Sequence, residues 1–308
     1  MKEFKASGNI FCIGSIIMDI SIKCPQFPCV GETRYTPYPY EVTPGGKGAN
    51  QAVAAARLGG NVKMLGRIST DEYGEKLEDT LKKTGINVDS LIKDEKEKSG
   101  VAFVWVNETG QNQIICSPAV NMKNRVEDFE NSLQMLQQGD IVIITMEFAV
   151  EVMTKVMEIV KEKGGFLILD PSGGDYSCLT KELCSQIDVV KPNEVEAEFI
   201  TGIKINDEKN ARKALEILES MGVTYPLISL GEKGVIYKMD DHVIHEKGIN
   251  VKAVDTTAAG DTFIGAFAAR LSTGSSFEEA VIYGNKAAAL CVQRQGAQAA
   301  IPYADEIL

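Results

Sequence analysis

Small residues lie between two aspartates in a segment near the end of the chain. The segment reads Val254-Asp-Thr-Thr-Ala-Ala-Gly-Asp-Thr-Phe-Ile-Gly265, and a helix is predicted to begin near Asp261. Backbone N–H groups at a helix start form an anion site, which the helix dipole strengthens. Helix capping explains one aspartate. Two aspartates around a run of small residues favour a functional anion site, with a structural loop as the alternative.

A second segment of this kind lies early in the chain and reads Thr43-Pro-Gly-Gly-Lys-Gly-Ala-Asn50. Its three glycines would let the backbone approach a ligand closely. Lys47 and Asn50 could bind hydroxyl groups, and Asn50 needs a polar partner if it is buried in the alanine-rich helix that follows. On these residues alone, a flexible turn before a helix is an equal alternative. The chain contains no Walker A sequence and no G-x-G-x-x-G after its first strand, which disfavours a nicotinamide oxidoreductase.

Acidic residues follow several predicted strands. Asp19 comes shortly after the first strand, and Glu147 follows the strand at 140–145. Ligands of α/β proteins bind at the carboxyl ends of the strands, so both carboxylates are candidate ligand-binding groups. The run Lys191-Pro-Asn-Glu-Val-Glu196 follows another strand, but an acid-rich helix start explains it without further function.

Composition excludes several classes of protein. The 308 residues carry 43 acidic and 32 basic side chains, a net charge of -11, which disfavours a nucleic-acid partner. Apolar runs such as Ile141-Val-Ile-Ile144 are far shorter than a membrane span, and the N-terminus does not resemble a signal peptide. The seven cysteines form no C-x-x-C pair. We therefore expect reduced thiols, a cytoplasmic location and no membrane association.

Predicted strands and helices alternate through most of the chain, which indicates a mostly parallel sheet covered by helices on both faces. We predict one three-layer α/β/α domain over residues 1–308. Two segments, about 20–44 and 99–118, break the alternation with prolines and a hairpin signal, and we expect them to form one small sheet that acts as a lid. Strands are expected at 9–15, 62–66, 140–145, 166–170, 187–190, 226–230, 234–238 and 242–246. Helices are expected at 49–58, 71–84, 127–138, 149–163, 194–201, 207–221, 261–272, 277–293 and 303–308.

Four motifs together resemble the ribokinase-like (PfkB) family of sugar kinases. They are Gly45-Gly-Lys-Gly-Ala-Asn50, Pro192-Asn-Glu-Val-Glu196, Ser229-Leu-Gly-Glu-Lys-Gly234 and Asp255-Thr-Thr-Ala-Ala-Gly-Asp-Thr-Phe263, in the family's order. The resemblance covers essentially the whole chain, and residues 45–58 and 294–298 are most similar to the ribokinase branch. It implies the three-layer fold and a β-sheet lid that also forms a homodimer.

The resemblance also implies roles for particular residues. Asp261 matches the catalytic base, which takes the proton from the acceptor hydroxyl. The positions that match the anion hole are Ala258, Ala259 and Gly260. Those that match sugar contacts are Asp19, Gly46, Lys47, Asn50 and Glu147. Asn193 and Glu196 match a motif linked to magnesium and phosphates. The nucleotide pocket is matched by Ser229, Gly231, Gly234 and Asn285, and the potassium loops by Asp255, Thr257, Cys291, Arg294 and Gly296.

The implied reaction is ATP-dependent phosphorylation of a sugar's primary hydroxyl, with Mg²⁺, activation by K⁺, and D-ribose to D-ribose 5-phosphate as the leading case. Three positions depart from the ribokinase pattern: Ile17 replaces an asparagine, Asn285 a histidine and Ala300 a serine. The loss of the asparagine keeps fructose, another ketose, a sugar acid and a nucleoside open as substrates. A non-catalytic sugar or nucleotide sensor is a further alternative, which the retained Asp261 and Gly260 disfavour.

Overall fold

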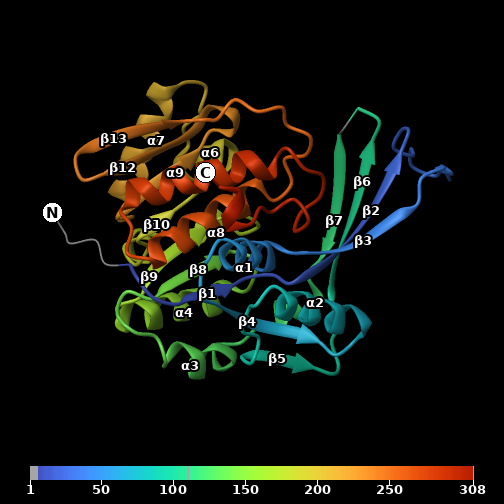
Figure 1. Cartoon of the computed structure of the whole chain (residues 1–308), viewed down its shortest axis with the longest axis horizontal. Helices are drawn as coiled ribbons and strands as arrows, with labels where there is room; N and C mark the ends of the chain where they lie inside the picture. The colour runs from blue at the N-terminus through green and yellow to red at the C-terminus, as the bar shows by residue number, and fades with distance from the viewer. Residues whose placement is uncertain (1–5, 110, 308) are drawn as a thin grey trace.

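A long sheet runs through the middle of the molecule (Figure 1). The computed structural model describes residues 6–109 and 111–307, and within them this sheet has nine strands in the order β13-β12-β11-β10-β9-β8-β1-β4-β5. All neighbours from β11 to β5 are parallel, and β12 and β13 pair antiparallel at the other edge. In sheet order the strands are His242–Lys247, Gly234–Met239, Tyr225–Ser229, Val189–Val190, Phe166–Asp170, Ile141–Thr145, Ile10–Ile13, Val62–Ser69 and Leu91–Asp94.

The central strands are continuous apolar runs because both faces of the sheet are covered. In β1, Ile10 and Cys12 pack into one core, whereas Phe11 and Ile13 pack into the other. The first core is covered by α1 (Lys47–Arg57), α2 (Glu72–Lys83), α8 (Ala259–Ser272) and α9 (Phe277–Cys291). The second is covered by α3 (Glu127–Leu133), α4 (Val150–Glu162), α5 (Lys181–Cys184), α6 (Glu194–Thr201) and α7 (Glu208–Ser220). The predicted three-layer α/β/α fold with a mostly parallel sheet is confirmed.

A separate four-stranded sheet projects from one end of this body (Figure 1). Its order is β3 (Tyr40–Gly45), β2 (Ile17–Cys24), β6 (Gly100–Asn107) and β7 (Asn112–Ser117). The central pair, β2 and β6, is parallel, and each outer pair is antiparallel. The two segments that interrupted the strand–helix alternation in the sequence therefore come together in one small sheet.

The strand register gives this small sheet two different faces. Asp19 lies opposite Thr43 and Ala102, and Ala102 lies opposite Cys116. Successive residues of a strand point to opposite faces, so the row that contains Asp19 shares one face, and the next row, with Ile20 and Phe103, shares the other. One face thus carries the candidate sugar contact and the other an apolar row.

The structure differs from the sequence predictions at several ends. The helix expected at 303–308 is only a short 3₁₀ turn, Ala304–Glu306; residue 308 lies outside the described residues. Strand β5 was not predicted, since two of its four residues are exposed at the sheet edge. Residue 110, in the predicted hairpin turn, is likewise outside the described residues. No helix among those described is long and apolar enough to cross a bilayer.

Candidate active site

Asp261 is buried in the first turn of α8, whose first residue is Ala259. Its carboxylate does not cap its own helix. Instead, Asn50 Nδ2 donates to Asp261 Oδ2 at 3.1 Å, and Gln51 Nε2 donates to Asp261 Oδ1 at 3.0 Å. The polar partner that Asn50 was predicted to need is therefore Asp261, and the two small-residue segments meet in space.

The start of α8 offers both backbone amides and a nearby positive charge. Ala258, at the N-cap, has a φ of 60°, a left-handed conformation that is costly for alanine and that turns the chain sharply into the helix. A side chain at Gly260 would have its Cβ 2.9 Å from Lys191 Nζ. The helix start and the Lys191 ammonium thus converge at the predicted anion hole, an arrangement that favours a negatively charged group.

Lys47 is the first residue of α1, directly after Gly46, whose φ of 91° suits glycine. Burial alone would lower the pKa of the Lys47 ammonium. The negative charges of Asp261, Asp170 and Glu147 outweigh that effect and raise the pKa above the ordinary value for lysine. Lys47 is therefore a permanent positive charge between the carboxylates of the site.

Two members of this site were missed in the sequence, Gln51 and Asp170. Gln51 Nε2 donates to Asp170 Oδ2 at 2.6 Å and also to Asp261 Oδ1, so that one amide joins the two carboxylates. Burial opposes ionisation of Asp170, but the charges of Lys47 and Lys191 hold its pKa below the usual range. The sequence signal for Asp170 was available, because it ends the predicted strand at 166–170 at the same sheet edge as Glu147.

The pKa of Asp261 is shifted in the opposite direction to that of Asp170. Burial raises the pKa of Asp261, and the negative charge of Asp170 adds to the rise. Lys47 and the amides of Asn50 and Gln51 oppose the rise without cancelling it. A carboxylate with a raised pKa accepts a proton more readily, which suits a general base.

Asp19 and Glu147 are two further, partly buried carboxylates on the predicted sugar side. A Cβ on Gly45 would lie 2.1 Å from Asp19 Oδ2, so the glycine makes room for this carboxylate. Burial raises the pKa of Asp19 to about 6, and the charge of Asp261 adds to it. Glu147 Oε2 accepts hydrogen bonds from Ser15 N at 3.3 Å and Thr145 Oγ1 at 3.1 Å, while burial raises its pKa.

A cavity of about 360 Å³ extends from Asp261 along the edge of the long sheet. The four residues predicted to contact the nucleotide all line it; they are Ser229, Gly231, Gly234 and Asn285. Asn285 Nδ2 donates to Lys247 O at 2.7 Å, which ties α9 to β13 at this end. Gly260 and Asp261 line the same cavity, so it connects the predicted nucleotide contacts to the predicted base.

Asn193 and Glu196 have a structural role and also face this cavity. Asn193 Oδ1 accepts from Glu196 N at 2.9 Å, and Glu196 Oε2 accepts from Asn193 N at 2.8 Å, which is a capping box at the start of α6. The structural alternative for this motif, an acid-rich helix start, is thus observed. Glu196 Oε1 also accepts from Ser172 Oγ at 2.6 Å, and all three residues line the cavity.

The structure brings most of the predicted potassium residues together. The Asp255 carboxylate accepts hydrogen bonds from Thr257 N and Gly296 N, both at 2.9 Å, and so joins the two loops. Cys291 Sγ lies 3.8 Å from Thr257 O. The Arg294 side chain instead pairs with Glu306. Among residues 6–109 and 111–307, no group of three or more His, Cys, Asp or Glu side chains is arranged to hold a metal.

Comparison with known proteins agrees with this geometry. The model of the pfkB family of carbohydrate kinases matches residues 7–304. The chain belongs to this family. It is 36% identical over 296 residues to the ribokinase of Haemophilus influenzae, and the match covers 96% of both chains. It is 31% identical over 294 residues to the deoxyribokinase of Salmonella typhi, and that match covers 96% of this chain and 95% of the other. The structure of Arabidopsis thaliana ribokinase complexed with ribose and ATP has a TM-score of 0.87 and 31% identity, and covers 98% of this chain and 97% of that one.

As a pfkB carbohydrate kinase, the chain has one unusual position near Asp19. Ile17 is 4% exposed, and its place two residues before Asp19 in β2 puts both side chains on the same face of the strand. A Cβ on Gly100 would lie 3.2 Å from Ile17 Cγ1. An apolar side chain therefore stands at position 17, where the resemblance to the ribokinase branch led us to expect an asparagine.

Proposed function

We propose that this kinase transfers the γ-phosphoryl group of ATP to the primary hydroxyl of a pentose, with D-ribose to D-ribose 5-phosphate as the first candidate. The observation that carries the proposal is the placement of Asp261. Its carboxylate is buried, has a raised pKa, lines the cavity and lies in the first turn of α8, beside the proposed anion hole. A base beside an anion site is the arrangement that phosphoryl transfer to an alcohol requires.

In this mechanism Asp261 accepts the proton of the attacking hydroxyl. Asn50 and Gln51 hold the two carboxylate oxygens in a single orientation. Oriented groups convert a bimolecular encounter into a unimolecular step, which accounts for much of the rate gain of enzymes. Asp19 and Glu147 orient the sugar by accepting hydrogen bonds from its other hydroxyls.

Backbone N–H groups and lysine side chains with fixed positions would stabilise the transferred phosphoryl group. The transition state of phosphoryl transfer is loose, so the protein contributes mainly positioning and electrostatic stabilisation. The backbone at Ala258, Ala259 and Gly260 would offer amides to the developing charge, of which Ala259 N donates to Thr256 O at 3.3 Å in this structure, and Lys191 and Lys47 add positive charge nearby. These groups are in place before the substrate arrives and need no reorganisation during the reaction.

The cavity fits Mg²⁺–ATP. Glu196 and Asp170 both line it and carry carboxylate oxygens, the ligand type that Mg²⁺ prefers, and Asn193 lines it as well. When bound, Mg²⁺ neutralises phosphate charge. The loops that Asp255 joins would hold a potassium ion through backbone carbonyl oxygens, since Ala300 offers no side-chain oxygen, and the ion would fix the loop that leads into α8.

We further propose that the four-stranded sheet is a lid over the sugar and also a dimer contact; it is called the lid sheet below. Phe103 and Ile115 lie side by side in neighbouring strands, on the face opposite to Asp19, and are 43% and 66% exposed. Such an exposed apolar row suits association with a second copy of the chain. We place the enzyme in the cytoplasm, where its co-substrate ATP is made and its seven unpaired cysteines stay reduced.

A second candidate substrate is 2-deoxy-D-ribose, and Ile17 is the observation that favours it. A buried apolar side chain gains nothing from a hydroxyl and leaves a buried hydroxyl without a partner. A pentose with one hydroxyl fewer avoids that cost. The relationship to a deoxyribokinase at 31% identity is consistent with this candidate.

A coupled assay that follows ADP release over a sugar panel tests the proposal. The panel contains D-ribose, 2-deoxy-D-ribose, D-fructose, a sugar acid and a nucleoside. We expect the highest kcat/KM with one of the two pentoses and a product phosphorylated on the primary hydroxyl. Turnover with fructose or a nucleoside alone would contradict the pentose assignment, and binding of sugar without any turnover would favour a sensor.

A further inference from the structure

The chain passes four times between the body and the lid sheet. It enters β2 after Ser15 and Ile16, leaves β3 at Gly45, enters β6 at Gly100 and leaves β7 at Pro118. One buried side chain, that of Asn121, lies among these crossings. Asn121 belongs to the short 3₁₀ turn Ala119–Lys123 that follows the lid sheet, and it is 1% exposed.

The amide of Asn121 joins the first crossing to the last. Its Oδ1 accepts a hydrogen bond from Ile16 N at 2.9 Å, and its Nδ2 donates to Ile16 O at 3.1 Å and to Pro118 O at 2.9 Å. A carbonyl oxygen can only accept and an N–H can only donate, so these partners determine the orientation of the amide. Ile16 directly precedes β2, the first strand of the lid sheet, and Pro118 directly follows β7, its last strand. This one side chain therefore holds the chain where it first enters and where it last leaves the lid sheet.

The third crossing passes directly beside the same amide. A Cβ on Gly100, the first residue of β6, would lie 2.6 Å from Asn121 Nδ2 and 2.9 Å from Pro118 O. Val120 N also donates to Lys98 O at 3.1 Å, just before β6. Glycine is thus required at position 100 because the strand and the Asn121 amide approach each other so closely.

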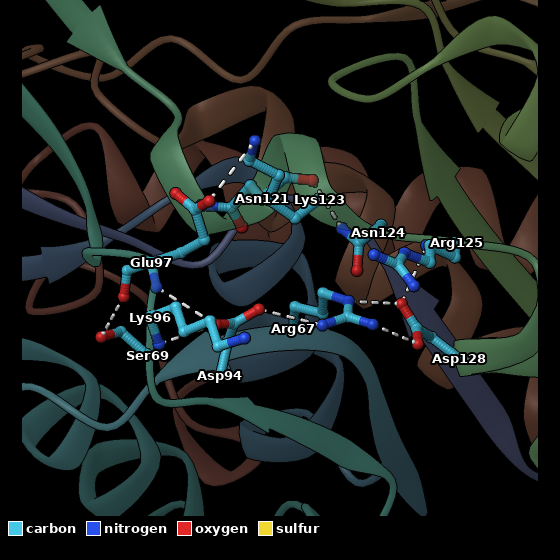
Figure 2. Close-up of polar contacts among 10 residues, drawn as sticks. All are labelled: Arg67, Ser69, Asp94, Lys96, Glu97, Asn121, Lys123, Asn124, Arg125 and Asp128. Atoms are coloured by element: carbon cyan, nitrogen blue, oxygen red, sulfur yellow. Dashed lines mark hydrogen bonds and ion pairs between the residues drawn. The ribbon is translucent and has the colours of Figure 1, made fainter.

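The body side of this junction carries a network of polar side-chain contacts (Figure 2). Asn124 Nδ2 donates to Asn121 O at 2.8 Å, which fixes the turn from behind. Nearby, Arg67 pairs with Asp94 at 3.0 Å and with Asp128 at 2.6 Å. Ala119, with a φ of 45°, keeps a conformation that is rare for alanine and that persists only when surrounding contacts impose it.

The segment that Asn121 holds, around Ile16, leads directly to the candidate sugar site. Ile16 lies three residues before Asp19, and Ser15 N donates to Glu147 Oε2. The position of Asp19 over the body therefore depends on how Ile16 is held. A shift of the lid sheet about its base would move Asp19 away from Glu147 and Asp261 together.

We propose that Asn121 is a positioning residue, which sets the angle of the lid sheet at its base and thereby places Asp19 over the sugar. The Asn121 amide is already bonded to the backbone of Ile16 and Pro118, so it acts through Ile16 and not by contact with a substrate. This inference rests on the proposed function, because it takes Asp19 as a sugar contact.

The test compares Asn121→Ala with Asn124→Ala, using the pentose that the wild type phosphorylates best. Each change removes a buried amide from the same turn, but only Asn121 bonds to the lid sheet's ends. We expect Asn121→Ala to raise the KM for the sugar by about tenfold, the effect of one or two lost buried hydrogen bonds, with the KM for ATP within about twofold of the wild type. ATP hydrolysis per sugar phosphorylated should also rise, because a displaced lid admits water.

Gly100→Ala provides a second approach to the same junction, since its added methyl group would displace the Asn121 amide from the side of β6. It should likewise raise the KM for the sugar and leave the KM for ATP nearly unchanged. Asn124→Ala should lower the Tm without raising the KM for the sugar relative to that for ATP. Equal sugar KM values for the two asparagine variants, or equal rises in both KM values, would overturn the inference. If Asn121→Ala does not fold, Gly100→Ala decides alone. A wild type that phosphorylates no sugar would overturn the proposed function instead, and this inference with it.

Discussion

The amide of Asn50 donates a hydrogen bond of 3.1 Å to the carboxylate of Asp261, although 211 residues separate them. The contact requires α1 and α8 to pack closely. A Cβ on Gly265 would lie 2.5 Å from Ala54 Cβ and 2.6 Å from Gln51 O, so glycine in α8 and alanine in α1 allow that approach. The small residues of both helices therefore bring the two motifs together, and the chemistry of the site depends on this helix contact.

The buried carboxyl of Asp19 should cost the enzyme stability. Its pKa is raised from 3.8 to about 6, mainly by burial, so the ionised form is disfavoured in the folded state. The cost is fully present above about pH 6 and disappears as the pH falls toward 3.8, where both states bind the proton. Asp19→Asn should therefore melt at a higher temperature than the wild type at pH 7.5. The gap in Tm should close at lower pH.

Thermal unfolding at several pH values measures this gap. Asp241→Asn, in the exposed turn between β12 and β13, is the control and should show no such trend. The same Asp19→Asn protein should have a raised KM for the sugar and a nearly unchanged KM for ATP. A Tm gap that does not depend on pH would contradict the burial of an ionised carboxyl as its cause. A larger change in the KM for ATP than in the KM for the sugar would contradict the assignment of Asp19 to the sugar.

Gln51→Leu should change the pH dependence of turnover. The amide of Gln51 lowers the pKa of Asp261 by stabilising its charged form, whereas burial and Asp170 raise it. Without that amide the pKa of Asp261 rises further, so the acid limb of kcat should move up by about one pH unit. The measurement is kcat from about pH 5 to pH 9. Gln186→Leu, outside the cavity, is the control; identical profiles for all three proteins would exclude this role for Gln51.

The sequence predicted the layers of the fold and the strands that carry several candidate site residues, but not the contacts between those residues. Continuous apolar runs such as 141–145 and 166–170, which alternate along the chain with helices, indicated a parallel sheet with both faces covered. The start of α6 was predicted at Glu194, where a capping box gives a local signal. Gln51 could not be assigned, because its partners Asp170 and Asp261 lie more than a hundred residues away and only the packing of α1 brings them together.

The contacts of Asn121 at the base of the lid sheet could not be predicted from the sequence either, because its partner Ile16 is distant in the chain. Asn121 lies in a polar stretch that reads as a loop, and its partner Ile16 is 105 residues earlier in the chain. Strand β5 was missed because its exposed residues do not follow an apolar pattern. The close approach that requires Gly100 has no local signature either, since a glycine at the start of a strand has many explanations.

Ile17→Asn tests the choice between the two pentoses. The wild type places apolar atoms on the sugar side of β2, so we expect it to favour 2-deoxy-D-ribose relative to typical ribokinases. An asparagine there restores a hydroxyl partner, and the ratio of kcat/KM for D-ribose to that for 2-deoxy-D-ribose should rise by about tenfold. Ile17→Val is the matched control with a smaller apolar side chain. An unchanged ratio in Ile17→Asn would show that position 17 does not contact the sugar.

Potassium should activate the enzyme through the loop before α8. Asp255 joins the loops around Thr257 and Gly296, and the first of these leads into the anion hole. A cation there would hold the amides in place before charge develops on the phosphoryl group. Turnover should rise with KCl at constant ionic strength, balanced by choline chloride, and less with NaCl. A flat response in enzyme stripped of potassium would reject the cation site and leave the role of Asp261 untouched.

The most direct test of the mechanism is the turnover of Asp261→Asn. Asparagine keeps the size of the side chain but cannot accept the proton of the sugar hydroxyl. We predict that kcat falls by ~10²–10⁴, the usual contribution of a general base, while the KM for the sugar changes little. Circular dichroism and Tm should show that the variant is folded. Turnover close to that of the wild type in a folded Asp261→Asn protein would contradict the assignment of Asp261 as the base and, with it, the mechanism proposed for this site.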